Sequence, residues 1–255
     1  MAKPTAAVFS FTGCEGCSLA ILECEKELLD VVKLVDFVEW REAMSERTEA
    51  MIDLGFIDGA ISTHHDEKKI RQVRERVRML ISIGACATNA GVNALKHRYG
   101  LREVKEIVYG EAGAEFDTIS ARPVHAVVPV EFEIPGCPIQ GEEFLRIVLD
   151  IVQGKQPRLP NYPVCVECKR KENVCVFEKG MICMGPVARA GCGADCPSYG
   201  AWCEACRGFV DNPNDEAHEE VLTKYGVTSE ELLQRYDIFC AYELEERKSR
   251  QQGQR

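Results

Sequence analysis

Apolar runs, basic residues and histidines are all scarce in this sequence, and each scarcity excludes a class of protein or site. No apolar run approaches the roughly 18 residues of a membrane-spanning helix, so we expect no membrane span. The chain has 31 lysines and arginines against 41 aspartates and glutamates, a net charge of -10, which argues against binding to nucleic-acid phosphates. The amino terminus lacks an apolar stretch with a cleavage site, so we expect no secretory signal and a cytoplasmic location.

The few histidines have no spacing typical of metal ligands, and we expect them to lie at the surface or to be hydrogen-bonded. They are His64, His65, His97, His125 and His218. Cysteine, in contrast, is abundant, with 14 among 255 residues. In a reducing compartment, cysteines in such number are better interpreted as metal ligands than as disulfide partners. The cysteines are therefore the candidate functional residues.

Residues 1–155 alternate short strand-like runs with helical patterns, which is typical of βαβ units and a mostly parallel sheet. We predict strands at residues 6–11, 31–40, 57–63, 79–85 and 124–134, and helices at residues 19–29, 66–78, 88–99 and 142–152. Three prolines between residues 156 and 163 indicate an extended linker. We therefore predict an α/β domain at residues 1–155 and a second domain at residues 156–255.

Four cysteines of the first domain follow predicted strand ends. Cys14 and Cys17 lie in the turn after the first strand, and Cys86 and Cys137 follow two later strands. In an open α/β sheet, ligands bind in the crevice beyond the carboxyl ends of the strands, so these four thiols could meet at one place. Four converging thiolates describe either a 4Fe-4S cluster or a zinc site, and spacing alone does not separate the two.

The second domain contains eight more cysteines between residues 165 and 206, interleaved with glycine and proline. By spacing they form two sets of four: Cys165, Cys168, Cys175 and Cys183, then Cys192, Cys196, Cys203 and Cys206. We expect this segment to build no hydrophobic core of its own and to fold around bound metal. Two zinc sites would fit the count. Iron-sulfur clusters are favoured over zinc for three reasons. No histidine is interspersed among these cysteines, proline follows Cys137 and Cys196, and a third set of four cysteines lies in the α/β crevice.

The neighbours of the first-domain cysteines form three distinctive segments: Thr12-Gly-Cys14-Glu-Gly-Cys17-Ser18, Gly84-Ala-Cys86-Ala87 and Ile134-Pro-Gly-Cys137-Pro138. They resemble, in the same order, the motifs for the proximal cluster in the small subunit of nickel-iron hydrogenases. Two later segments, Cys183-Met-Gly-Pro186 and Cys203-Glu-Ala-Cys206, resemble the motifs of that family's distal and medial clusters. The sequences around Cys165 and Cys192 are most similar to the cytoplasmic branch of the family.

This resemblance implies a flavodoxin-like first domain, an irregular iron-sulfur second domain with C-terminal helices, and three 4Fe-4S clusters. It also implies a role in electron transfer beside a nickel-bearing large subunit and a flavin or iron-sulfur acceptor subunit of the NAD(P)-reductase or heterodisulfide-reductase type. The chain would then be part of an enzyme without being catalytic alone. We name the ligand sets accordingly: proximal (Cys14, Cys17, Cys86, Cys137), distal (Cys165, Cys168, Cys175, Cys183) and medial (Cys192, Cys196, Cys203, Cys206).

Two positions depart from the periplasmic relatives in this resemblance. Cys165 stands where those proteins have a histidine, and Cys196 supplies a fourth thiol to a cluster that they hold with three. Both departures imply 4Fe-4S clusters held only by cysteine. Cys24 and Cys240 remain outside the three sets and are expected to be packing residues on helices. Glu15 is expected to be solvated or hydrogen-bonded, with tuning of the cluster or proton relay as the alternative.

Two other functions compete with this interpretation. One is the cluster-bearing subunit of complex I-type oxidoreductases, which shares the proximal site. That subunit has adjacent cysteines where this chain has Cys14 and Cys17, and it has no cysteine-rich second domain. The other is a zinc-stapled structural or interaction protein, which would be colourless, whereas an iron-sulfur protein is brown.

Overall fold

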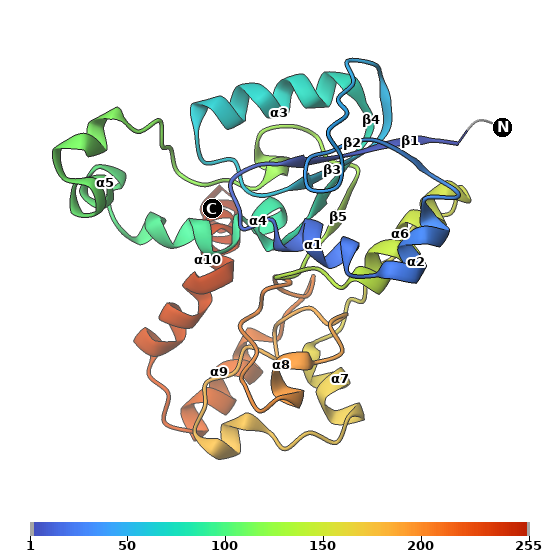
Figure 1. Ribbon diagram of the computed structural model, residues 1–255. Coiled ribbons are helices and arrows are strands. Elements are labelled where there is room, and N and C mark those ends of the chain that lie inside the picture. Colours follow the sequence, from blue (N-terminus) through green and yellow to red (C-terminus); the bar gives the residue numbers. More distant parts are fainter. Residues whose placement is uncertain (1–2, 254–255) are drawn as a thin grey trace. The chain divides into compact units, whose positions relative to one another are not determined.

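A five-stranded parallel sheet forms the centre of the first unit. The computed structural model describes residues 3–253, and its strands are β1 (Thr5–Ser10), β2 (Asp36–Trp40), β3 (Ile52–Asp58), β4 (Val77–Ile83) and β5 (Phe132–Ile134). They are hydrogen-bonded in the order β2-β1-β3-β4-β5, and every pair is parallel (Figure 1). This is the flavodoxin-like order, in which the chain moves outward in opposite directions from β1 and β3. The predicted α/β class is confirmed, and the switch point lies where β1 and β3 end.

Helices cover both faces of this sheet. On one face, α3 (His64–Arg76) packs Ile70 and Val73 into a buried apolar cluster with Ile57 of β3. On the other face lie α1 (Gly16–Leu22), α2 (Glu25–Val31) and α6 (Gly141–Val152), where Phe144 packs edge to face on Phe56 with ring centroids 4.9 Å apart (Figure 1). Because Phe56 and Ile57 are neighbours on one strand, their side chains point to opposite faces, so β3 is buried on both sides.

The remaining helical elements of this unit are short. They are α4 (Gly84–Asn89), α5 (Leu101–Tyr109) and the 3-10 segments η1 (Gly91–Arg98), η2 (Gly110–Glu115) and η3 (Val124–Ala126).

Several predicted boundaries are wrong, each for a local reason. The strand predicted at 57–63 is β3 at Ile52–Asp58, because Gly59 turns the chain at a φ of 104° and Thr63 caps α3 by accepting a hydrogen bond from the Asp66 N–H. The helix predicted at 19–29 is split into α1 and α2 around Cys24, and α2 occupies the start of the strand predicted at 31–40. The prediction for 142–152 is confirmed by α6.

The other boundaries concern β4, β5 and the segment between them. The strand predicted at 79–85 begins at Val77, where the helix predicted at 66–78 has already ended, and it stops at Ile83. The predicted helix 88–99 is largely the 3-10 segment η1, since Ala90 interrupts it at a φ of 64°. Only Phe132–Ile134 of the strand predicted at 124–134 is a strand, because η3 and Pro129 occupy its first half.

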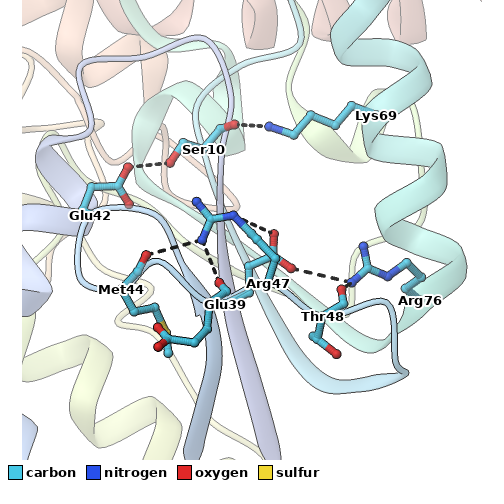
Figure 2. A network of polar contacts seen from close by, with 9 residues as sticks. Ser10, Glu39, Glu42, Met44, Arg47, Thr48, Lys69 and Arg76 are labelled. Atoms are coloured by element: carbon cyan, nitrogen blue, oxygen red, sulfur yellow. Dashed lines mark hydrogen bonds and ion pairs between the residues drawn. The ribbon is translucent and has the colours of Figure 1, made fainter.

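A network of polar contacts fixes the carboxyl end of β1, where the first cysteine turn begins. Lys69 of α3 donates a hydrogen bond from Nζ to the Ser10 carbonyl oxygen at 2.7 Å, and Ser10 Oγ donates to Glu42 at 2.9 Å (Figure 2). Glu42 also accepts a hydrogen bond from Ser18 Oγ at 3.2 Å, while Trp40 Nε1 donates to the same hydroxyl. Glu42 therefore contacts residues on both sides of the turn that carries Cys14 and Cys17.

The second unit comprises residues 159–255, and the chain divides between Arg158 and Leu159. Its helical elements are α7 (Val164–Arg170), η4 (Val176–Lys179), α8 (Asp195–Ser198), α9 (Asp215–Lys224) and α10 (Ser229–Gly253). The cysteine-rich segment was expected to build no hydrophobic core of its own, and the structure shows that it shares one with the rest of the unit. A buried apolar cluster joins Phe177, Met184 and Val187 of the cysteine-rich segment to Leu222 of α9 and Cys240 of α10.

Thr228 and Glu231 form a capping box at the start of α10, with Thr228 Oγ1 accepting from the Glu231 N–H at 3.2 Å and the Glu231 carboxylate accepting from the Thr228 N–H at 2.9 Å. No helix among residues 3–253 is both long enough and apolar enough to cross a membrane.

Candidate metal centres

The structure brings the four proximal cysteines together at the carboxyl edge of the sheet. Cys14 follows β1, Cys17 lies on α1, Cys86 lies on α4 directly after β4, and Cys137 follows β5. Burial and the nearby charges of Cys137, Asp58 and Cys14 raise the pKa of the Cys86 thiol to about 12. Burial also raises the pKa of Cys17, to which the charges of Asp58, Cys86 and Cys137 contribute. Each of the four thiols thus lies within electrostatic reach of at least two of the others.

Glycines allow the close approach of these cysteines. A Cβ atom on Gly84 would lie 2.2 Å from Cys17 Sγ, and Gly84 itself has a φ of 82°. The Ala85 N–H donates a hydrogen bond to the Gly136 carbonyl oxygen at 2.6 Å, which ties the turn carrying Cys86 to the turn carrying Cys137. A side chain at position 84 would therefore displace Cys17 and separate the elements that hold the other thiols.

The proximal set has a buried side and an open side. Cys17 is buried and Cys86 is half-buried, whereas Cys14 and Cys137 are exposed. Thiols with raised pKa values hold their protons in the absence of a cation, and a bound cation stabilises the thiolate, so metal uptake at this set releases protons. Four cysteine thiols are the donor set of a 4Fe-4S cluster, and the residues present fit that group.

Asp58 is a functional candidate that sequence reasoning missed. It is the last residue of β3, its side chain is 4% exposed, and its carboxylate accepts a hydrogen bond from the Ser18 N–H at 3.1 Å. Burial raises the pKa of Asp58 to about 6, although the Ser18 hydrogen bond opposes this. Its position could have been found from the sequence, because an aspartate that ends an apolar strand and precedes glycine points to the carboxyl edge of the sheet.

The four distal cysteines also form one group. Burial raises the pKa of Cys165 to about 12, and the charges of Cys183, Cys168 and Cys175 contribute to this shift. Gly185 leaves room for two of these thiols, since a Cβ atom there would lie 3.3 Å from Cys165 Sγ and 3.4 Å from Cys183 Sγ. Four thiols again fit a 4Fe-4S cluster.

The medial cysteines form the third group. Burial raises the pKa of Cys203 well above its usual range, with contributions from Cys183, Cys206 and Cys192. Burial and then the charge of Cys192 raise the pKa of Cys196. One backbone contact joins this group to the distal one: the Cys203 N–H donates a hydrogen bond to Cys183 Sγ at 3.3 Å.

Two residues that sequence reasoning did not single out as functional support these groups. Glu167, on the helix between Cys165 and Cys168, accepts hydrogen bonds from the Gly191 N–H at 2.9 Å and the Ala194 N–H at 3.2 Å. It therefore shapes the loop that carries Cys192. His218 is fully buried, and its Nε2 lies 3.2 Å from the Cys183 carbonyl oxygen, with Nδ1 3.2 Å from the Tyr236 hydroxyl.

The hydrogen bonds of His218 define its tautomer. A carbonyl oxygen only accepts, so Nε2 carries the proton and Nδ1 accepts from Tyr236. His218 therefore agrees with the expectation that each histidine lies at the surface or is hydrogen-bonded. Two others, His64 and His125, lie beside Glu67 and Glu133 respectively.

Cys24 and Cys240 differ from each other in environment. Cys240 is fully buried in the apolar cluster of the second unit, and its thiol lies 3.7 Å from the Ala205 carbonyl oxygen. Cys24 lies between α1 and α2 rather than on a helix, and its thiol donates to the Ala20 carbonyl oxygen at 3.4 Å.

Glu15, at a φ of 60°, lies 3.8 Å from Arg41 in a partly exposed ion pair. Among residues 3–253, no three His, Cys, Asp or Glu side chains lie close enough to hold a single metal ion.

Comparison with known proteins identifies the family. Residues 14–151 match the family described as NADH ubiquinone oxidoreductase, 20 Kd subunit. Over 92% of this chain and 98% of the relative, the sequence is 36% identical to the sulfhydrogenase 2 subunit delta of Pyrococcus furiosus. The chain belongs to the nickel-iron hydrogenase small subunits within this family. It is therefore part of a hydrogenase complex, and membership implies iron-sulfur clusters.

Other relatives of this small subunit agree with that assignment. A subunit of the F420-non-reducing hydrogenase vhu of Methanococcus voltae is 31% identical over 91% of both chains. Among solved structures, an NAD+-reducing [NiFe]-hydrogenase matches with a TM-score of 0.56 and 24% identity, covering 62% of this chain and 96% of that one. The Ni-Fe-Se hydrogenase from Desulfomicrobium baculatum matches with a TM-score of 0.54 and 14% identity, covering 85% and 98%. The two structures show that the fold is shared.

The complex I-type alternative is not supported over the whole chain. The match to the NADH ubiquinone oxidoreductase family spans residues 14–151. Of the three cysteine sets, these residues contain only the proximal one. The sulfhydrogenase and vhu relatives also span the second unit, and both are hydrogenase subunits. The cysteine-rich second unit therefore separates the two functions, as the sequence predicted.

Proposed function

We propose that this small subunit carries electrons within a cytoplasmic hydrogenase, between the nickel-iron site of a large subunit and an acceptor subunit, through three 4Fe-4S clusters. The acceptor subunit would be of the flavin or iron-sulfur kind, in a NAD(P)-reductase or heterodisulfide-reductase type of complex. The main supporting observation is that twelve cysteines lie in three groups of four, in which each thiol is within electrostatic reach of at least one other thiol of its group. The cytoplasmic location rests on the resemblance of the segments around Cys165 and Cys192.

The proximal set is proposed to face the large subunit. A bound 4Fe-4S cluster takes up and releases single electrons. Cys17 and the apolar residues around it would shield one side of the site from water, while exposed Cys14 and Cys137 leave the other side accessible to a partner protein. The adjoining segment also exposes apolar side chains, among them Val92, 44% exposed, and Leu95, 36% exposed. Exposed apolar side chains beside an electron-entry site suit a subunit contact.

Within the second unit, the chain itself connects the two remaining sets. The hydrogen bond from the Cys203 N–H to Cys183 Sγ joins a medial ligand to a distal ligand through one backbone contact. The buried side chains of Met184 and Ala205, beside these cysteines, exclude water from the same region. Both features support electron passage between these two sets.

Metal analysis tests the proposed stoichiometry. The purified anaerobic protein should be brown and contain about twelve irons per chain, with the proximal, distal and medial sets each holding about four. Cys24→Ser and Cys240→Ala should retain the full iron content, because neither thiol belongs to a set. Loss of about four irons in either variant would show that the ligands are partitioned differently. A colourless protein containing zinc would contradict the proposed function.

The isolated small subunit should neither consume nor produce hydrogen. The proposed function places the nickel site on the large subunit, and all twelve grouped cysteines of this chain are assigned to clusters. Hydrogen-dependent dye reduction is the measurement, with the reconstituted two-subunit complex as the active control. Hydrogen-dependent reduction by the chain alone, after removal of every other subunit, would contradict this division of roles.

A further inference from the structure

Asn93 makes a side-chain hydrogen bond to a proximal thiol. It lies on η1, and its Nδ2 is 3.3 Å from Cys86 Sγ and 3.5 Å from the Thr12 carbonyl oxygen. Thr12 precedes Cys14 in the turn after β1, so one amide group contacts two segments that carry proximal cysteines. The carbonyl oxygen only accepts, and a cysteine that binds a cluster is a thiolate that likewise offers no proton. The amide must therefore present its NH2 group to them, which fixes its orientation.

The local backbone explains why residue 93 reaches residue 86. α4 ends at Asn89 and is followed by Ala90 and Gly91, both in the left-handed region at φ values of 64° and 50°. A Cβ atom on Gly91 would lie 3.1 Å from the Cys86 nitrogen, so the chain passes closely over the start of α4. The Gly91 N–H donates to Asn89 Oδ1 at 3.0 Å and holds this turn. η1 thus folds back over the helix that carries Cys86, and Asn93 is held against the thiol.

A hydrogen-bond donor beside Cys86 Sγ stabilises negative charge on that sulfur. A cysteine that binds a cluster is a thiolate, and its sulfur becomes more negative when the cluster gains an electron. An N–H directed at that sulfur stabilises the reduced state more than the oxidised state, and hydrogen bonds to the sulfurs are among the determinants of cluster potential.

We propose that Asn93 is a positioning residue that raises the reduction potential of the proximal cluster through its hydrogen bond to Cys86. The inference rests on the proposed function, because it requires a cluster at this set. Asn93 is half-buried, and it lies beside Val92 and close to Leu95, both exposed. The reduction potential of the proximal cluster therefore depends on the conformation of this exposed segment, because the segment positions the Asn93 donor.

The test is a redox titration of the purified hydrogenase complex, followed by electron paramagnetic resonance. The proximal signal is identified as the one that Cys137→Ser removes. At the midpoint potential of the wild type, Asn93→Leu should lower the ratio of reduced to oxidised proximal cluster about fivefold, since it removes one hydrogen bond to a charged acceptor. Asn93→Gln, which retains an amide donor, should recover most of this ratio.

A matched control is available on another ligand set. Asn173 Nδ2 lies 3.7 Å from Cys168 Sγ, so Asn173→Leu removes the same kind of contact from the distal set. It should leave the proximal ratio unchanged. If Asn93→Leu loses iron, Asn93→Ala removes the donor without a branched apolar group and permits the same measurement. An unchanged proximal ratio in a fully iron-loaded Asn93 variant would overturn the inference. Absence of iron from the wild type would instead contradict the proposed function, and iron analysis detects that separately.

Discussion

Replacing Cys137 by serine is expected to abolish hydrogen-dependent reduction of the acceptor by the assembled hydrogenase. Cys137 is one of the two exposed residues of the proximal set, but its thiol is partly buried, and this burial together with the charges of Cys14 and Asp58 raises its pKa. A serine hydroxyl ionises far less readily than a thiol and is a poor ligand for iron. The entry site for electrons from the large subunit should therefore be lost or altered, and acceptor reduction should fall to the background rate.

The measurement separates electron transfer from hydrogen chemistry. Because the proposed function places hydrogen activation at the nickel site of the large subunit, the Cys137→Ser complex should retain hydrogen–deuterium exchange while acceptor reduction is lost. Cys24→Ser is the matched control, because Cys24 is a cysteine of the same unit that belongs to no set. A Cys137→Ser complex that reduced its acceptor at the normal rate would show that electrons bypass this set.

The oxidised wild-type protein should show no stoichiometric 3Fe-4S electron paramagnetic resonance signal, and Cys196→Ser or Cys196→Pro should create that signal or lose the medial cluster. Cys196 lies on α8, within electrostatic reach of Cys192. A fourth thiolate allows the medial site to hold a fourth iron, and without it only three irons have cysteine ligands. An additional anionic ligand should also favour the oxidised cluster and lower its potential. A low potential suits transfer to nucleotide acceptors.

The exposed position of Cys196 separates the loss of a cluster ligand from a loss of folding. Cys196 is exposed, so its replacement creates no buried cavity and leaves the apolar cluster around Phe177 and Phe209 intact. Cys240→Ala is the control from the same unit, since Cys240 is buried near Ala205 and belongs to no set. It should retain the wild-type spectrum. A full 3Fe-4S signal in the anaerobically prepared wild type would contradict the role assigned to Cys196.

The fold of the first unit could be predicted in type and less well in its boundaries. Alternation of apolar strands with amphipathic helices identified the parallel sheet, and β1 was found within one residue at each end. Residues 124–134 were misjudged because their apolar content resembles a strand, while η3 and Pro129 prevent strand pairing before Phe132. Tertiary contacts also determine the core of the second unit. Leu222 and Cys240, remote in sequence from the cysteine loops, complete its apolar cluster.

The sequence by itself indicated that the candidate sites are built from cysteine thiols, because cysteine spacing and the residues beside each cysteine are local properties of the chain. Twelve candidate ligands and their three sets could be named from it. Only the tertiary structure revealed that Asp58 from the end of β3 and Asn93 from η1 act on those thiols, and that Glu167 from α7 holds the loop that carries Cys192. Such contacts depend on strand order and on turns such as the one at Gly91, where the direction of the backbone places a polar side chain against a sulfur. Spacing along the chain carries no information about that direction.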